Sequence, residues 1–188
     1  MNHLMIDLIN TSEKQSSPLC AIEAVFFEPS TGQIGKAFYS SIDIRKAQSL
    51  KGRLSIQTAF DWMKKDSHWR AEVMSATATE EDVLCELAGF IADNTRPQNT
   101  ALFVWFKDTQ EKLVSLRYAV DRSEVSGIFP EGTKFRCIRS LLDLAAATDY
   151  APHARNALAR YTLTDALYQA EQVCEIWQRL TSPHIESI

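Results

Sequence analysis

Hydrophobic and polar residues alternate along the first third of the chain with the two-residue period of β-strands. The alternation covers residues 3–10, 19–27 and 36–44, and the second of these stretches is rich in Val, Ile and Phe. A polar loop, TSEKQSSP, separates the first two stretches, and EPSTGQIG, between the second and the third, has the residues of a turn. We therefore expect a first strand followed by a hairpin at one edge of a sheet.

The rest of the chain changes to the period of helices. Apolar residues recur at helical spacing over residues 58–70, 80–92, 109–120, 139–147 and 163–180, and Thr79 with Asp82 has the pattern of a capping box. Residues 101–106 are wholly apolar, which is typical of a buried central strand. Strands followed by helices around a buried strand predict an α/β fold, a mixed sheet flanked by helices. No repeat or long linker divides the chain, so we expect one domain over residues 1–188.

The composition narrows the class of function. With 188 residues, 45% of them hydrophobic, the chain is long enough for one substantial core, and no apolar run approaches the ~20 residues of a membrane span. Asp7 interrupts the short apolar run at the N-terminus, so we expect no secretory signal and a cytoplasmic protein. The formal net charge of −4 gives no general attraction to nucleic acid. The four cysteines form no CxxC pair and predict neither a zinc site nor a disulfide framework.

Several segments together resemble one class of nuclease. They are MNHLMIDL at the start, the hairpin SPLCAIEAVFFEPSTGQIGKAFY, the helix over residues 58–70, VW at 104–105, CIRSLLDLA from residue 137 and the final helix LTDALYQAEQVCEIWQRL. With them the chain resembles the ribonuclease H-like fold of the DEDDh 3′-5′ exonucleases, and in particular the small exonuclease VIII-like proteins of phages and prophages. The resemblance implies three N-terminal antiparallel strands plus parallel strands, flanked by helices.

The resemblance also implies a site for two divalent ions. In that family the ions are held by an Asp and a Glu of the first strand, the Asp of an F-D-N helix start and the Asp of H-x-x-x-x-D, whose His is the general base. Asp7 and Asp165 match the first and the last Asp. Ile9 stands where the Glu is expected, Lys112 where the F-D-N Asp is expected, and Arg160 where the His is expected. The matched site is therefore degenerate.

The replacements also change the charge of the site. Two cations, Lys112 and Arg160, now accompany two carboxylates, Asp7 and Asp165, so the site is near neutrality without metal. We interpret the two cations as substitutes for the ions, paired with the two aspartates, and expect no functional catalytic residue and no metal cofactor. The alternative is a Mg²⁺ or Mn²⁺ ion on Asp7 and Asp165. Taken singly, each aspartate is also explained as a structural residue at a strand end or in the first turn of a helix.

Three further carboxylates bear on this interpretation. Glu23 stands where the family has a glycine that keeps the second strand slim, and a carboxylate there crowds or repels a phosphate. Asp108 and Glu111 lie close to Lys112, so that a shift of the alignment restores a carboxylate at its position. Either of them, or Glu23, then completes a metal site in the alternative interpretation.

Three hypotheses of function follow from the sequence. The first is a pseudo-exonuclease of a phage or prophage that binds or inhibits a protein: a host nuclease or defence component, a recombination factor or a catalytic homologue, with homo-oligomers left open. The second is a weakly active metal-dependent 3′-5′ exonuclease on single-stranded DNA or RNA. The third is a metal-free protein that binds nucleic-acid ends through Lys112 and Arg160. We assign the four tryptophans to the core or an interface rather than to base stacking: Trp62, Trp69, Trp105 and Trp177.

Overall fold

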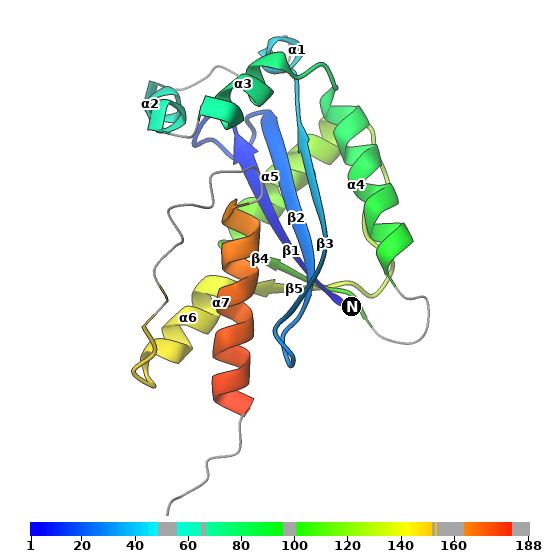
Figure 1. Cartoon of the computed structure of the whole chain (residues 1–188). Helices are drawn as coiled ribbons and strands as arrows, with labels where there is room; N and C mark the ends of the chain where they lie inside the picture. The colour runs from blue at the N-terminus through cyan, green and yellow to red at the C-terminus, as the bar shows by residue number, and fades with distance from the viewer. Residues whose placement is uncertain (49–55, 65–66, 96–100, 152, 154–163, 182–188) are drawn as a thin grey trace, which may run out of the picture.

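In the computed structural model, helices cover both faces of a mixed β-sheet (Figure 1). The structure describes residues 1–48, 56–64, 67–95, 101–151, 153 and 164–181. Within these residues the sheet has the order β3-β2-β1-β4-β5. β1, β2 and β3 are antiparallel to one another in turn, whereas β4 pairs parallel to β1 and β5 parallel to β4. The predicted fold class is thereby confirmed. The strands are β1 (His3–Asn10), β2 (Leu19–Glu28), β3 (Gln33–Ser41), β4 (Phe103–Phe106) and β5 (Lys134–Cys137).

The helices form two layers and a cap over the end of the sheet (Figure 1). α4 and α5 pack on one face of the sheet, and α6 and α7 pack on the other. None of the helices that the structure describes is long and apolar enough to cross a membrane. The helices in the described residues are α1 (Ile44–Gln48), α2 (Ile56–Lys64), α3 (Ser67–Ser75), α4 (Glu80–Asn94), α5 (Thr109–Ser123), α6 (Ile138–Ala146) and α7 (Thr164–Thr181).

Side chains of β1 alternate between the two helical layers. Leu4, Ile6 and Leu8 are buried in the cluster under α4 and α5, and Met5 is buried in the cluster under α6 and α7. Because side chains of a strand point to opposite faces in turn, Asp7 lies on the same face as Met5. This alternation places a carboxylate on the α7 face of the sheet, opposite Glu23, which contacts the first turn of α7.

Two polar arrangements fix the N-terminal end of α4. Thr79 and Asp82 form the predicted capping box, in which the Thr79 hydroxyl accepts from the Asp82 N–H at 3.1 Å and the Asp82 carboxylate accepts from the Thr79 N–H at 2.8 Å. Glu80 is buried, binds the guanidinium of Arg122 from α5 through both oxygens at 2.8 Å and accepts from the Leu19 N–H at 2.8 Å. This bidentate pair ties α4, α5 and the start of β2 together.

Several predicted bounds were wrong. The third strand runs over Gln33–Ser41 instead of 36–44, because Gly32, at φ +75°, makes the turn and the second glycine of the GQIG sequence lies inside the strand. The helix predicted over 58–70 is two helices, α2 and α3. The strand predicted over 101–106 begins at Phe103. β5 and α1 were missed, since each is only four or five residues long and shows no period of its own.

Candidate functional site

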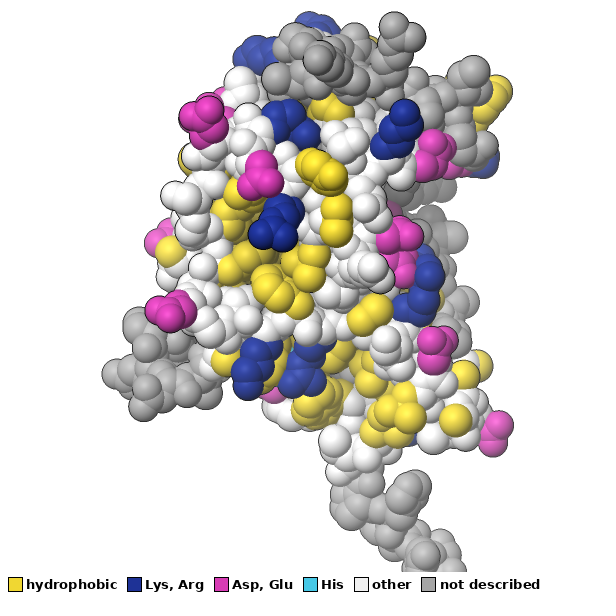
Figure 2. Space-filling view, turned by 180° about the vertical axis from the view of Figure 1, so that it is seen from behind, with side chains coloured by type: hydrophobic (Ala, Val, Ile, Leu, Met, Phe, Trp, Pro, Cys, Tyr) yellow, Lys and Arg dark blue, Asp and Glu magenta, His cyan; other side chains and the backbone are white. Residues whose placement is uncertain are grey.

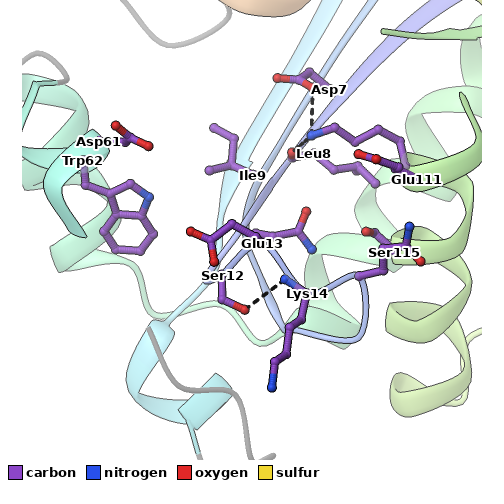
Figure 3. Close-up of a pocket in the computed structure, with 13 residues that line it drawn as sticks. Asp7, Leu8, Ile9, Ser12, Glu13, Lys14, Asp61, Trp62, Glu111 and Ser115 are labelled. Atoms are coloured by element: carbon purple, nitrogen blue, oxygen red, sulfur yellow. Dashed lines mark hydrogen bonds and ion pairs between the residues drawn. The ribbon is translucent and has the colours of Figure 1, made fainter. Parts of the chain in front are cut away.

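The end of β1 opens into a cleft, which we call the Asp7 cleft (Figure 3). Its volume is about 450 Å³, with α2 on one side and α5 on the other. It brings together three positions that the resemblance to the DEDDh exonucleases singles out. They are Asp7 and Ile9 of β1 and Lys112 of α5. The lining residues are Asp7, Leu8, Ile9, Asn10, Ser12, Glu13, Lys14, Gln15, Asp61, Trp62, Glu111, Lys112 and Ser115.

Lys112 reaches from α5 to the backbone and to the carboxylate of β1. Its Nζ lies 3.3 Å from Oδ1 of Asp7 and donates a hydrogen bond of 2.5 Å to the carbonyl oxygen of Leu8. The Lys112 side chain is 24% exposed and that of Asp7 is 13% exposed, so water screens this pair less than a surface pair. A cation in the first turn of a helix is disfavoured by the helix dipole. Asp7 supplies the compensating negative charge, and the Leu8 carbonyl accepts a hydrogen bond from the ammonium.

Ile9 belongs to an apolar cluster instead of a metal site. It is half-buried and packs against the buried residues Cys20, Trp69 and Val73, together with Trp62. The cluster joins the end of β1 to α2 and α3. At the position where the resemblance leads one to expect a carboxylate, the side chain therefore contributes to packing.

Glu23 lies directly opposite Asp7 in the pairing of β1 with β2. Its side chain is buried, and its Oε2 accepts a hydrogen bond of 3.1 Å from the N–H of Ala166. That N–H is in the first turn of α7, next to Asp165, where the helix presents its positive end and unpaired N–H groups. The structure thus gives Glu23 an anchoring contact with α7 beside Asp7, and it brings the first turn that contains Asp165 to the same region.

The remaining predicted site residues are placed as follows. Arg160 lies outside the described residues, so its pairing with Asp165 stays a prediction. Asp108, the residue before α5, forms an ion pair of 2.9 Å with Arg139, whereas Glu111 is exposed at the rim of the Asp7 cleft. The α5 side chain that contacts Asp7 is therefore that of Lys112.

The side chains around Asp7 do not fit a two-metal centre. Such a centre needs several carboxylates that converge on the ions. In the described part of the chain, no group of three or more His, Cys, Asp or Glu side chains is placed to hold a metal ion. At the two positions where carboxylates are expected beside Asp7, the chain has the ammonium of Lys112 and the apolar side chain of Ile9.

Sequence reasoning missed two residues near the site. Trp62 packs against the apolar cluster of Trp69, as its assignment to the core predicted, but its lining of the Asp7 cleft was not predicted. Tyr39 pairs with Glu23 across β3 and β2, and burial, with smaller contributions from the carboxylates of Glu72 and Glu23, raises the pKa of its hydroxyl. No local signal points to either residue, because both positions depend on strand register and on how α2 packs.

Known structures share this fold at low sequence identity. A full-length 3′-exonuclease superposes with a TM-score of 0.67 at 13% identity, covering 94% of this chain and 81% of that one. The nuclease domain of 3′hExo, a DEDDh family member bound to rAMP, gives 0.66 at 12% identity, covering 94% and 92%. A 3′-exonuclease that recognises the 3′ end of a histone mRNA stem-loop gives 0.62 at 13%, covering 95% and 80%. At this identity the likeness concerns the fold.

Comparison of the sequence with protein families identifies the family of this chain. Among curated proteins, no sequence matches this chain. One family model, by contrast, matches residues 2–177, which is nearly the whole chain. That match includes β1 with Asp7, the hairpin, α5 with Lys112 and most of α7. The chain belongs to the family of Rv2179c-like 3′-5′ exoribonuclease domains.

Proposed function

We propose that this domain is a catalytically degenerate DEDDh exonuclease that acts by binding another protein. The observation that carries the proposal is the contact of the Lys112 ammonium with Asp7 and with the backbone of β1. The family resemblance puts an aspartate at this position of α5 and a glutamate at the position of Ile9. The chain has a cation and an apolar side chain there instead.

Electrostatics supports this proposal over two-metal hydrolysis. A divalent ion and an ammonium 4 Å apart repel each other by about 8 kcal/mol at an effective dielectric constant near 20, which is twice the value for two unit charges. A metal ion that binds Asp7 must therefore displace Lys112 from both of its partners. The displaced ammonium would also leave the Leu8 carbonyl without its charged donor.

Two alternatives differ in what supports them. A weak metal-dependent 3′-5′ exonuclease is favoured by the retained Asp7 and Asp165 and by the family to which the chain belongs. Binding of a nucleic-acid end by Lys112 has less support, because its ammonium is already engaged by Asp7 and Leu8. We retain the exonuclease as the alternative that the experiment decides.

The partner is inferred from the resemblance to phage and prophage proteins. The candidate partners are a host nuclease or defence component, a recombination factor, or a catalytic homologue whose fold this chain shares. A homologue is the simplest of these, since a degenerate copy can occupy the surface that the active copy uses for its own contacts. Sedimentation of the chain alone, and then mixed with an active homologue, measures self-association and mixed association separately.

The test combines metal binding with digestion. Titration calorimetry with MgCl₂ and MnCl₂ is run on the wild type, on Asp7→Ala/Asp165→Ala and on Ile9→Glu/Lys112→Asp. The same proteins are incubated with 3′-labelled single-stranded RNA and DNA in Mn²⁺. We expect no saturable heat and equal background digestion for the wild type and the alanine variant. The Ile9→Glu/Lys112→Asp variant should gain metal binding, because three carboxylates then meet at the cleft.

Urea denaturation of each variant serves as the control for folding. Tight binding of two ions by the wild type contradicts the proposal. So does digestion that Asp7→Ala/Asp165→Ala abolishes in a folded protein.

A further inference from the structure

β5 is one edge of the sheet, and in the part of the chain that the structure describes no strand pairs with its outer side. Its inner side pairs with β4, where the Lys134 N–H donates to the Leu102 carbonyl at 2.8 Å. Successive residues of a parallel strand direct their backbone groups to opposite sides, so the N–H and C=O of Phe135 point outward. Residues 134–136, which we call the β5 edge, therefore offer the backbone donor and acceptor that an added strand uses.

Two cations of the β5 edge stand on aromatic rings. Lys134 and Arg136 are alternate residues, so they lie on one face of the sheet, which they share with their partners on β4, Phe103 and Trp105. The Arg136 guanidinium lies over the Phe103 ring, 4.3 Å from the ring centroid, and 5.4 Å from the centroid of Trp105. The Lys134 ammonium lies 5.8 Å from the Phe103 centroid. A guanidinium held by its face keeps its in-plane N–H groups available to an anion.

These two charges have no partner of opposite sign among the residues that the structure describes. Neither side chain forms an ion pair or donates a hydrogen bond there. The nearby carboxylate of Glu28 accepts from the Ser30 hydroxyl at 2.8 Å and forms no ion pair with Arg136. Lys134 is exposed and Arg136 is half-buried. The β5 edge thus presents two cations on one face, whereas β3, the other edge strand, has only Lys36.

These charges select the kind of chain that fits the β5 edge. A second copy of β5, or any basic strand, would place like charges opposite each other, and lysine on an edge strand deters such pairing. Nucleic acid is disfavoured by the formal net charge of −4, and Trp105, under the cations, is 2% exposed and has no ring face free for a base. On the face shown in Figure 2, Lys and Arg side chains are scattered among apolar and acidic ones and form no continuous track. An acidic peptide strand is the complementary occupant.

We propose that the β5 edge binds an extended acidic segment of the partner protein as an added strand. This inference rests on the proposed function and gives the chemistry of the partner. Carboxylates at alternate positions of the segment, about 7 Å apart, meet Lys134 and Arg136. An apolar residue between them packs beside Phe135, which is 41% exposed on the opposite face. The backbone of the segment exchanges hydrogen bonds with the N–H and C=O of Phe135.

The experiment titrates the full chain, labelled with ¹⁵N and kept in EDTA, and follows the amide resonances by NMR. The probe is the acetylated and amidated peptide Glu-Val-Glu-Val-Glu. Three other ligands are compared with it: the block peptide Glu-Glu-Glu-Val-Val, the basic peptide Lys-Val-Lys-Val-Lys and a six-nucleotide oligothymidylate. The block peptide has the same composition and charge as the probe but lacks the alternation of a strand.

Two variants remove one cation each, Lys134→Gln and Arg136→Gln, and the dispersion of each spectrum shows whether the variant is folded. Lys134→Gln changes an exposed side chain, so it tests the proposal even if Arg136→Gln disturbs the aromatic rings beneath it. Lys36→Gln is the matched control, since Lys36 is an exposed lysine on the opposite edge strand of the same sheet.

We expect the alternating acidic peptide to bind most tightly and to shift the Phe135 amide more than the amides of β3. Rising salt should weaken this binding. Lys134→Gln should weaken it by about two- to fivefold, the range for one exposed ion pair, and Arg136→Gln by at least as much. Lys36→Gln should leave it unchanged.

Four results overturn the inference. They are an unshifted Phe135 amide, equal affinity for the alternating and the block peptide, tighter binding of the basic peptide or the oligothymidylate, and equal effects of Lys134→Gln and Lys36→Gln. Because EDTA removes divalent ions, these results are separate from the metal and digestion test. A chain that neither digests nucleic acid nor binds the acidic peptide keeps the proposed function and loses only this inference.

Discussion

Replacing Lys112 with methionine tests the ion pair on which the proposed function depends. Lys112→Met keeps the apolar stem of the side chain and removes the ammonium. The Leu8 carbonyl then loses its charged donor, and Asp7 loses its cation on a face of the sheet where Glu23 is its cross-strand neighbour. We therefore expect the variant to be less stable than the wild type.

The expected loss in free energy of unfolding is about 1–2 kcal/mol. A hydrogen bond to a charged group contributes about 1.5–3 kcal/mol. Removal of a cation from the first turn of α5 returns about 0.3–1 kcal/mol, because the helix dipole disfavours the cation there. The 24% exposure of the Lys112 side chain keeps the estimate well below the cost of breaking a fully buried pair. For a chain of this length, such a loss lowers Tm by about 2–8 °C.

Urea denaturation followed by circular dichroism measures the difference. Lys107→Met is the matched control, because Lys107 is exposed just before α5 and its substitution should change stability by less than about 0.5 kcal/mol. A double-mutant cycle with Asp7→Asn isolates the ion pair and should give a coupling of about 0.5–1 kcal/mol. If Lys112→Met matches the wild type, or if the coupling is zero, Lys112 does not stabilise Asp7 and the electrostatic argument is wrong.

Three other predictions follow from the structure. Arg122→Met should lower the free energy of unfolding by about 3–5 kcal/mol, since it leaves the buried carboxylate of Glu80 without its cation. Arg117→Met, on the exposed side of α5, is the control and should have little effect. Urea denaturation measures the free energy of unfolding of both variants. Burial lowers the pKa of His3 from 6.5 to about 4, so the wild type should lose stability as the pH falls from about 6.5 toward 4, and His3→Gln should flatten that slope in denaturation curves. Glu23→Ala should speed amide hydrogen exchange in the first turn of α7 more than in its last turn; equal acceleration contradicts the anchoring role.

The sequence predicted the long elements better than the short ones. The bounds of β1 matched, and those of β2 and α4 differed by only one or two residues, because a clear period or a capping box marks each of them. β5 is four residues, KFRC, and its strand character comes from pairing with β4 rather than from its own pattern. Such elements depend on the assembled sheet, so a local reading of the chain misses them.

The candidate site, too, was predicted from the sequence only in part. The family resemblance pointed to Asp7 and Lys112, and charge alone suggested that they pair. The contact of Glu23 with α7 had no such signal, because it depends on the pairing of β2 with β1 and on the packing of α7 against the sheet. The aromatic wall of the Asp7 cleft depends likewise on the position of α2.

The charges around Asp7 support our proposal that the site has been converted and has not simply decayed. Two carboxylates on neighbouring strands, Asp7 and Glu23, repel each other when no cation is present. The structure compensates each one separately: Lys112 contacts Asp7, and the N-terminal end of α7 donates to Glu23. A site that had only lost its metal ligands would leave Asp7 uncompensated, and an apolar replacement of Asp7 would then be more stable. The presence of Asp7 together with a lysine bound to it therefore supports our proposal of a site that is stable without metal.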